Sequence, residues 1–141
     1  GREPSEEVRR LGEEISQVTV TGYVPDLAPY VARASCVVVP IRTGAGLRGK
    51  ILEAWAAGKA VVSTAVAAEG FKGRPGEHLL VADDAEGFAR NVLQVLRDDK
   101  LRERLGALGR ALVEDQYSAD AFAEGYEKAY ADVLEGVQKR G

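Results

Sequence analysis

Hydrophobic positions change their period twice between residues 37 and 64. Residues 37–39 and 61–62 are uninterrupted β-branched runs, which are typical of strands covered on both faces. Between them, apolar side chains recur at three- and four-residue intervals on one helical face: Leu47, Ile51, Leu52, Trp55 and Ala56. Gly58 stands where such a helix would end in a left-handed residue. The stretch therefore predicts a strand, a crossover helix and a second strand parallel to the first.

The residues before this stretch predict three shorter elements. Pro4 and the acids that follow it suit the first turn of a short helix, which Gly12 would close. Residues 17–21 alternate and are β-branched, which predicts a strand. Asp26 is the expected N-cap of a helix over residues 27–34. Because an α/β domain of this kind normally begins with a strand, we expect the chain to be a fragment that lacks its opening strand.

The residues after this stretch predict one more strand and a series of helices. Residues 65–77 read as a long Gly-containing loop with one helical turn near residues 67–69, and residues 78–81 as a short strand. Three helices should follow, with these candidate caps: Asp83 or Asp84, Asp98 or Asp99, and Ser118.

The order of these elements predicts an α/β fold. We expect a Rossmann-like parallel sheet flanked by helices over residues 1–116, and a C-terminal helix over residues 117–141 that packs on the same domain. A length of 141 residues suits one domain with a single core.

The amino-acid composition limits the kinds of binding partner and the cellular location that we expect for this protein. A net charge of -3 gives no reason to expect nucleic acid as a partner. Cys36 is the only cysteine, so it is expected to be a buried thiol, and one histidine without a Cys/His cluster predicts no metal site. No apolar run reaches the roughly 18 residues of a membrane span, and the first ten residues, GREPSEEVRR, lack the apolar segment of a signal peptide. We therefore expect a cytoplasmic protein, with peripheral attachment to a membrane left open for the full-length protein.

A glycine-containing loop lies at the carboxyl end of the first buried strand and opens the crossover helix. Ligands of open α/β sheets bind at that edge, and helix N-termini attract anions. Arg42, Arg48 and Lys50 surround the loop and would suit a diphosphate, although a solvated basic rim is an equal alternative. The loop is neither a P-loop nor G-x-G-x-x-G.

Other polar residues near this edge each carry two interpretations. Glu53 follows the loop by one to two helical turns and could hold a ribose diol, but spacing alone favours a solvated helix carboxylate. Glu69 overhangs the same edge or is an ordinary surface acid. Tyr23 and Val24 follow a predicted strand and could wall a base pocket or simply pack. His78 is expected to be a satisfied strand-edge histidine. No catalytic triad or useful carboxylate pair can be assembled.

Taken together, the motifs resemble the C-terminal donor-binding domain of GT-B glycosyltransferases of the group 1 type. The segments that carry the resemblance are G-Y-V-P-D-L-A-P-Y-V-A-R-A, V-V-V-P-I-R-T-G-A-G-L-R-G-K-I-L-E-A-W-A-A-G-K-A-V-V-S-T, E-G-F and H-L-L-V-A-D-D. The chain is most similar to bacterial sugar transferases of exopolysaccharide-type gene clusters. The resemblance covers the chain from about residue 1 to residue 130.

The resemblance implies a nucleotide-sugar donor and assigns roles to particular positions. Glu53 would be the second glutamate of the family's Glu-x7-Glu motif and hold the ribose hydroxyls. The backbone N–H groups of four loop residues would face the diphosphate or the donor sugar: Gly44, Ala45, Gly46 and Leu47. Residues 22–24, with Gly22 first, and residues 40–42 would border the base. No cofactor or metal is implied, since these groups would neutralise the leaving diphosphate.

Two departures from the family pattern bear on function. The first glutamate of Glu-x7-Glu falls at Ala45, which puts the choice of donor sugar in doubt. The N-terminal acceptor-binding domain and the domain's opening strand and helix are missing, so we expect the piece to be inactive alone and its exposed sheet edge to favour self-association. The alternative is a non-catalytic doubly wound module that binds a nucleotide or a protein.

Overall fold

The computed structural model describes residues 3–44 and 49–118. The chain divides into two compact units, Gly1–Ala32 and Arg33–Gly141. Each unit is described by itself. The helix expected after Ser118, and with it the expected C-terminal helix over residues 117–141, lies outside the described residues except at its first two positions.

The first unit contains two capped helices. Helix α1 (Glu6–Glu14) begins after Ser5, whose side chain accepts a hydrogen bond from the Val8 N–H. Helix α2 (Ala28–Arg33) begins where the Asp26 carboxylate accepts the Ala28 N–H at 2.9 Å, as the sequence predicts, and ends at the boundary between the units. Short polar side chains therefore set the start of both helices.

Two expectations for the first unit are wrong. Residues 17–21 form no strand, because the described part of this unit contains no second strand with which their backbone could pair. Gly12 does not close α1, which continues to Glu14. Instead, the lack of a side chain at Gly12 lets Val20 pack against the helix, since a β-carbon on Gly12 would lie only 2.7 Å from Cγ2 of Val20. The alternation in residues 17–21 thus reflects packing on a helix and not pairing in a sheet.

The second unit is built on a three-stranded parallel sheet in the order β1-β2-β3. The strands are β1 (Cys36–Val39), β2 (Ala60–Ser63) and β3 (Leu80–Val81). All four residues of β2 are buried, as expected for a strand covered on both faces. The same expectation is wrong for β1, where Val38 is 46% exposed, because β1 is an edge strand of the sheet.

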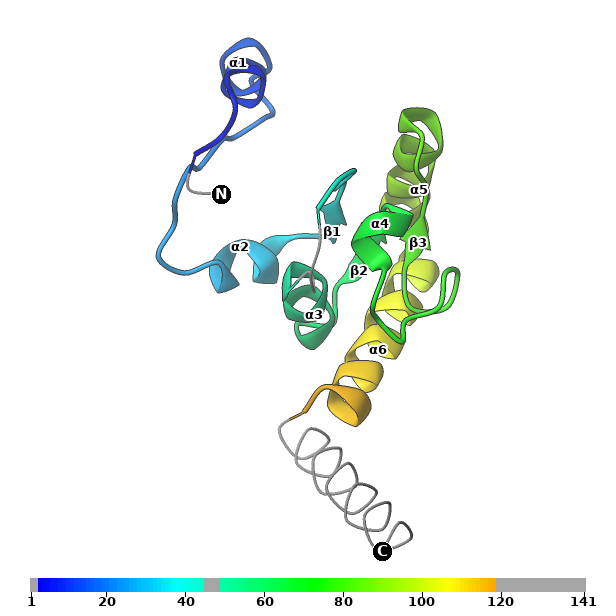
Figure 1. Cartoon of the computed structure of the whole chain (residues 1–141). Helices are drawn as coiled ribbons and strands as arrows, with labels where there is room; N and C mark the ends of the chain where they lie inside the picture. The colour runs from blue at the N-terminus through cyan, green and yellow to red at the C-terminus, as the bar shows by residue number, and fades with distance from the viewer. Residues whose placement is uncertain (1–2, 45–48, 119–141) are drawn as a thin grey trace, which may run out of the picture. The chain divides into compact units, whose positions relative to one another are not determined.

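Helices cover both faces of this sheet (Figure 1). Helix α3 (Gly49–Ala56) packs Ile51 and Trp55 on the face that carries Val61, and helix α5 (Ala85–Arg97) packs Val95 on the opposite face with Val62. Helix α6 (Asp99–Gln116) contributes to both layers, and the short helix α4 (Ala65–Ala68) follows β2. This arrangement confirms the expected α/β class with a parallel sheet flanked by helices.

Element boundaries in the second unit follow local chemistry. Gly58 has a φ of 66°, the left-handed conformation predicted for the end of the crossover helix. Of the two candidate caps predicted for each helix, Asp84 caps the start of α5 and Asp98 caps the start of α6. Strand β3 starts at Leu80, later than the expected residue 78, because the His78 N–H bonds to the Arg74 carbonyl in a turn.

Trp55 is the centre of the larger core and is fully buried. Its Nε1–H donates to the His78 carbonyl at 3.0 Å, and the Phe71 ring packs edge-on at 5.8 Å between centroids. The imidazole of His78 accepts the Arg74 N–H at 3.1 Å, which confirms that this histidine is a satisfied structural residue. Gly73 and Gly109 lie against the indole, where a β-carbon on either would overlap the ring. Close packing on both sides of the ring therefore fixes α3 against α6.

This packing predicts that Gly109→Ala destabilises the protein. Alanine favours a helix over glycine by about 1 kcal/mol, but its methyl group would overlap Trp55, and overpacking costs about 1–3 kcal/mol. We expect the free energy of unfolding in urea to fall by up to about 2 kcal/mol, because the clash outweighs the propensity. Gly49→Ala is the matched control, because among the described residues its β-carbon would meet Oε1 of Glu53 alone, at 3.9 Å. Equal stabilities of the two variants would contradict the packing argument.

Candidate functional site

The carboxyl ends of the three parallel strands lie at one edge of the sheet and carry a pocket. Because the strands are parallel, the loops after β1, β2 and β3 emerge at the same edge. The pocket has a volume of about 250 Å³. It is lined by residues from these three loops and from the first turns of α5: Pro40, Arg42, Thr64, Asp83, Asp84, Ala85, Phe88 and Ala89. This is the edge at which open α/β sheets bind ligands.

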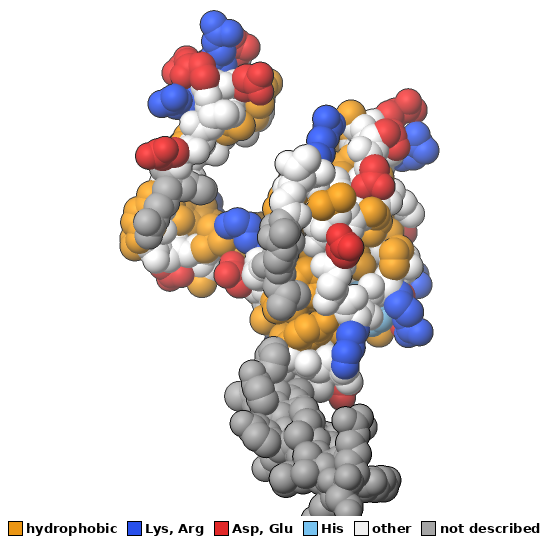
Figure 2. All heavy atoms as spheres, in the orientation of Figure 1, with side chains coloured by type: hydrophobic (Ala, Val, Ile, Leu, Met, Phe, Trp, Pro, Cys, Tyr) orange, Lys and Arg blue, Asp and Glu red, His pale blue; other side chains and the backbone are white. Residues whose placement is uncertain are grey.

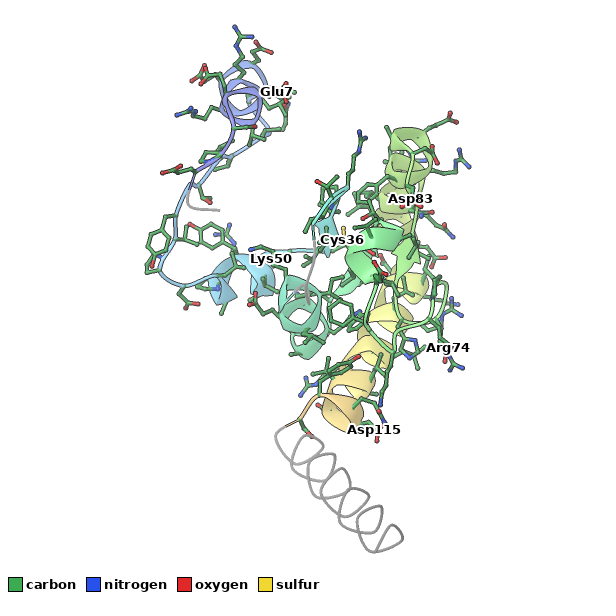
Figure 3. The ribbon with its side chains drawn as sticks, viewed as in Figure 1. Glu7, Cys36, Lys50, Arg74, Asp83 and Asp115 are labelled. Carbon is green, nitrogen blue, oxygen red and sulfur yellow. The ribbon has the colours of Figure 1, made fainter. Side chains whose placement is uncertain are left out.

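Two hydrogen bonds join the three loops at this edge. The Thr64 hydroxyl donates to the Ile41 carbonyl in the loop after β1 and accepts the Ala67 N–H at 3.2 Å. The Asp83 carboxylate, in the loop after β3, accepts the Ala65 N–H at 2.8 Å. Figure 3 labels Asp83 where β3 leads into α5, beside α4. The loops are therefore linked in the order β1, β2, β3.

Sequence reasoning missed both of these residues as site residues. It treated Asp83 only as a possible cap of α5, a position that Asp84 holds, and it did not single out Thr64. One feature of the sequence could have identified Thr64, because a Thr directly after a buried strand and before a helical turn is placed to cap that turn at the ligand edge. Asp83 has no such local signal, since its partner lies 18 residues away.

Glu53 projects from α3 toward the start of the helix. Glu53 is exposed, and its Oε1 atom lies 3.9 Å from the position that a β-carbon on Gly49 would take. Lys50 is exposed on the same first turns, and no ion pair joins either residue to another side chain in the described ranges. An ionised carboxylate has room to accept two hydroxyl hydrogen bonds, so Glu53 is chemically able to hold a diol.

The predicted anion loop is only partly described. Arg42 lines the pocket and is exposed, and Gly44 has a φ of 127°, a conformation that favours glycine. The four other loop positions lie outside the described residues: Ala45, Gly46, Leu47 and Arg48. Their assignment to a diphosphate remains a prediction.

Of the residues predicted to border the base, Pro40 and Arg42 line this pocket, whereas Glu69 lines another hollow and residues 22–24 belong to the first unit. Glu69 ends α4 and lines a separate open hollow of about 390 Å³, which shares no residue with the pocket at Arg42. Tyr23 and Val24 belong to the first unit, together with Gly22, whose φ is 64°. Their membership of one site with Glu53 remains a prediction.

Charge on the second unit is mixed. Figure 2 shows acidic and basic side chains interspersed with hydrophobic ones on the visible face of this unit. In the described ranges, no three His, Cys, Asp or Glu side chains gather as a metal site would require. No helix in those ranges is long and apolar enough to cross a membrane.

Two ionisable groups in the second unit have perturbed pKa values. Burial raises the pKa of the half-buried Cys36 thiol, and the nearby charge of Arg102 opposes this only in part. The Gly87 N–H donates to the Asp84 carboxylate at 2.7 Å and lowers its pKa, with help from the charge of Arg90. Asp84 thus keeps a negative charge at the mouth of the pocket at neutral pH.

Comparison with known proteins shows which family this chain resembles. The family model described as "Glycosyl transferases group 1" matches residues 1–98. The lipopolysaccharide core biosynthesis glycosyltransferase LpsE of Rhizobium meliloti is 37% identical over 112 residues, which cover 78% of this chain and 33% of that protein. Sucrose-phosphate synthase from Thermosynechococcus elongatus matches the structure with a TM-score of 0.74 at 28% identity, over 92% of this chain and 34% of that chain. The chain therefore spans about a third of the length of these relatives.

The lowered pKa of Asp84 predicts how its cap responds to pH. A carboxylate whose pKa is lower in the folded state than in the unfolded state stabilises the fold above the unfolded value, and this contribution disappears as pH falls through the folded pKa. We therefore expect Asp84→Ala to melt well below the wild type at pH 7, and the difference to shrink below about pH 4. Glu103→Ala, which removes an exposed carboxylate that is no cap, is the control. A melting difference for Asp84→Ala that does not change with pH would contradict the prediction.

Proposed function

This chain belongs to the group 1 family of glycosyl transferases and has the GT-B type of α/β fold, and we propose that it is the donor-binding portion of its enzyme. The enzyme would transfer a hexose from a nucleoside diphosphate sugar to an acceptor. The observation that carries this proposal is the position of Glu53 and Lys50 on the first turns of α3, directly after the loop that leaves β1 at the ligand edge.

The proposed donor contacts divide between the ribose and the diphosphate. The Glu53 carboxylate accepts hydrogen bonds from the two ribose hydroxyls. Arg42, Arg48 and Lys50 supply positive charge for the diphosphate, and backbone N–H groups of residues 44–47 supply hydrogen bonds. Gly22, Tyr23 and Val24 border the base, and Glu69 contributes from the loop after β2.

The proposed catalytic contribution of this chain is electrostatic. As the bond between the sugar and the diphosphate breaks, negative charge grows on the departing phosphate oxygens. Cations and backbone N–H groups at the start of α3 stabilise that charge without changing position. The acceptor and any group that activates it would come from an acceptor-binding domain outside this chain, so we expect the chain alone to bind donor without transferring sugar.

The acceptor class is proposed by analogy with a relative. LpsE is named for lipopolysaccharide core biosynthesis, and we propose a growing bacterial surface glycan, of the lipopolysaccharide or exopolysaccharide kind, as the acceptor. We propose that the reaction takes place in the cytoplasm or at the inner side of the membrane.

The alanine at position 45 is the reason to consider a second function. Because an alanine replaces the first glutamate of the Glu-x7-Glu motif, a non-catalytic module that has kept the fold without donor binding is the alternative. Nucleotide binding separates the two, since only the donor-binding proposal requires Glu53 to matter.

Calorimetric titration of the full-length protein with UDP, GDP and ADP tests this proposal. One of these nucleotides should bind, and Glu53→Ala should weaken that binding at least about tenfold, because hydrogen bonds to a charged group are the stronger kind. Glu103→Ala removes an exposed glutamate on α6 and should leave the affinity unchanged.

Two results would contradict this account. The absence of binding by every nucleotide tested would sink the donor-binding proposal. Equal affinity of the wild type and Glu53→Ala would sink the assignment of Glu53 to the site.

We also propose that this 141-residue chain associates with a second copy of itself through β1. In the described part of the second unit, β1 pairs with a strand on one side only, so its outer backbone groups join no sheet within that part, and Val38 on this strand is 46% exposed. Two copies that pair at this edge would satisfy those groups and cover both valines.

The association predicts an effect of charge at the edge. The wild-type chain should show a sedimentation coefficient that rises with concentration, and Val38→Lys should remain monomeric, because a lysine on an edge strand opposes pairing. Leu93→Lys is the matched control, since Leu93 has the same 46% exposure but lies on α5. A wild-type chain that stays monomeric at high concentration would contradict the proposal.

A further inference from the structure

Thr64 holds two neighbouring loops together from a buried position. Thr64 is 4% exposed. Its hydroxyl group donates a hydrogen bond to the Ile41 carbonyl, and the oxygen of the same group accepts the Ala67 N–H at 3.2 Å. Only a hydroxyl of this size can donate across to the first loop and accept from the second at the same time. Both bonds belong to the carboxyl edge of the sheet.

Asp83 adds the third loop to this link. Its Oδ1 accepts the Ala65 N–H at 2.8 Å, whereas the cap of the following helix is provided by Asp84. The carboxylate of Asp83 therefore serves the loop after β2 and not the helix that follows it. Thr64 and Asp83 line the same pocket as Arg42.

We propose that Thr64 and Asp83 are positioning residues that hold the loops after β1, β2 and β3 in the arrangement that binds the nucleotide. The proposal rests on the donor-binding function above, and it adds residues to which no role has been assigned. Both act through backbone groups of their neighbours. The Thr64 hydroxyl donates its proton to the Ile41 carbonyl and accepts the Ala67 N–H, so we assign its effect on the nucleotide to the loops that it holds.

The physical reason is a shift in population. Arg42 is the residue after Ile41, so its backbone is fixed by the bond from Thr64, and Glu69 follows the helix that Thr64 caps. Without that bond, the loop after β1 spends part of its time in other conformations. The apparent dissociation constant then rises in inverse proportion to the fraction of molecules that remain competent to bind.

A cap at the opposite end of the sheet provides a matched control. Asp98 accepts the Leu101 N–H at 2.9 Å and begins α6, whose Leu101 and Leu105 pack against Ala60 at the amino end of β2. Asp98→Ala therefore removes a helix cap of the same kind far from the ligand edge. It controls for a loss of stability that has nothing to do with binding.

The experiment measures nucleotide affinity and melting temperature in the full-length protein. UDP, GDP and ADP are titrated one at a time into the wild type, Thr64→Val, Thr64→Ser, Asp83→Ala and Asp83→Asn, with Asp98→Ala and Glu53→Ala alongside. We expect Thr64→Val and Asp83→Ala to bind about three- to tenfold more weakly, the loss expected for one hydrogen bond. Thr64→Ser and Asp83→Asn keep the bonds and should bind like the wild type.

The controls separate positioning from stability and from the donor-binding function. Asp98→Ala should melt at a lower temperature and keep its affinity. If Thr64→Val and Asp83→Ala bind as well as Asp98→Ala while Glu53→Ala binds weakly, the positioning role is overturned and the donor-binding function stands. If the serine and asparagine variants bind as weakly as valine and alanine, the hydrogen bonds are not the cause and the positioning role is again overturned. If no nucleotide binds the wild type, both proposals fall.

Discussion

Burial of β2 on both faces is the constraint on which the second unit depends. All four of its residues are buried, and its backbone pairs with β1 on one side and β3 on the other. The hydrophobic effect then requires a helical layer above and below: α3 supplies Trp55 on one face, and α5 and α6 supply Val95 and Leu105 on the other. Losing a buried side chain as large as Trp55 costs about 3–5 kcal/mol in typical cores, several times one neutral hydrogen bond. Packing therefore decides this architecture, and hydrogen bonds adjust it.

The same constraint decides where chemistry can take place. Helix α6 joins both layers by passing the amino end of β2, where Gly106 lies against the Gly58 carbonyl so closely that a β-carbon would overlap it. Loops occupy the carboxyl end. There the smaller interactions also matter, because the bonds from Thr64 and Asp83 link three loops in addition to the packing of Ile41 and Ala67 on the core. A group 1 glycosyl transferase can thus vary its loops over a core that stays the same.

Sequence patterns predicted those parts of the fold that local chemistry controls. The β-branched run predicted β2, and the helical spacing of apolar residues predicted α3. Single residues predicted the turn at Gly58 and, as one of two candidates in each case, the caps at Asp84 and Asp98. The strand expected over residues 17–21 failed because alternation marks a half-covered segment whether its partner is a strand or, as here, the helix at Gly12.

The candidate site was predictable in part for the same reason. Helical spacing placed Glu53 and Lys50 together on α3, and strand ends placed Arg42 at the ligand edge. The links that Thr64 and Asp83 make between loops were not predictable, because the partners in those links lie 23 and 18 residues away in the sequence. Glu69 also follows a strand end, yet it lines a different hollow, since the order of loops around an edge depends on tertiary packing.

The central claim is that the carboxyl edge of this sheet binds a nucleotide. Amide chemical-shift mapping by NMR, with UDP, GDP and ADP added singly to isotope-labelled protein, tests it most directly. The account predicts that the binding nucleotide shifts amide resonances of residues 42–44, 49–53 and 64–67, and leaves those of Gly58 and Asp98 at the opposite end unchanged. Shifts centred on Gly58 and Asp98, or no shifts with any of the three nucleotides, would contradict it.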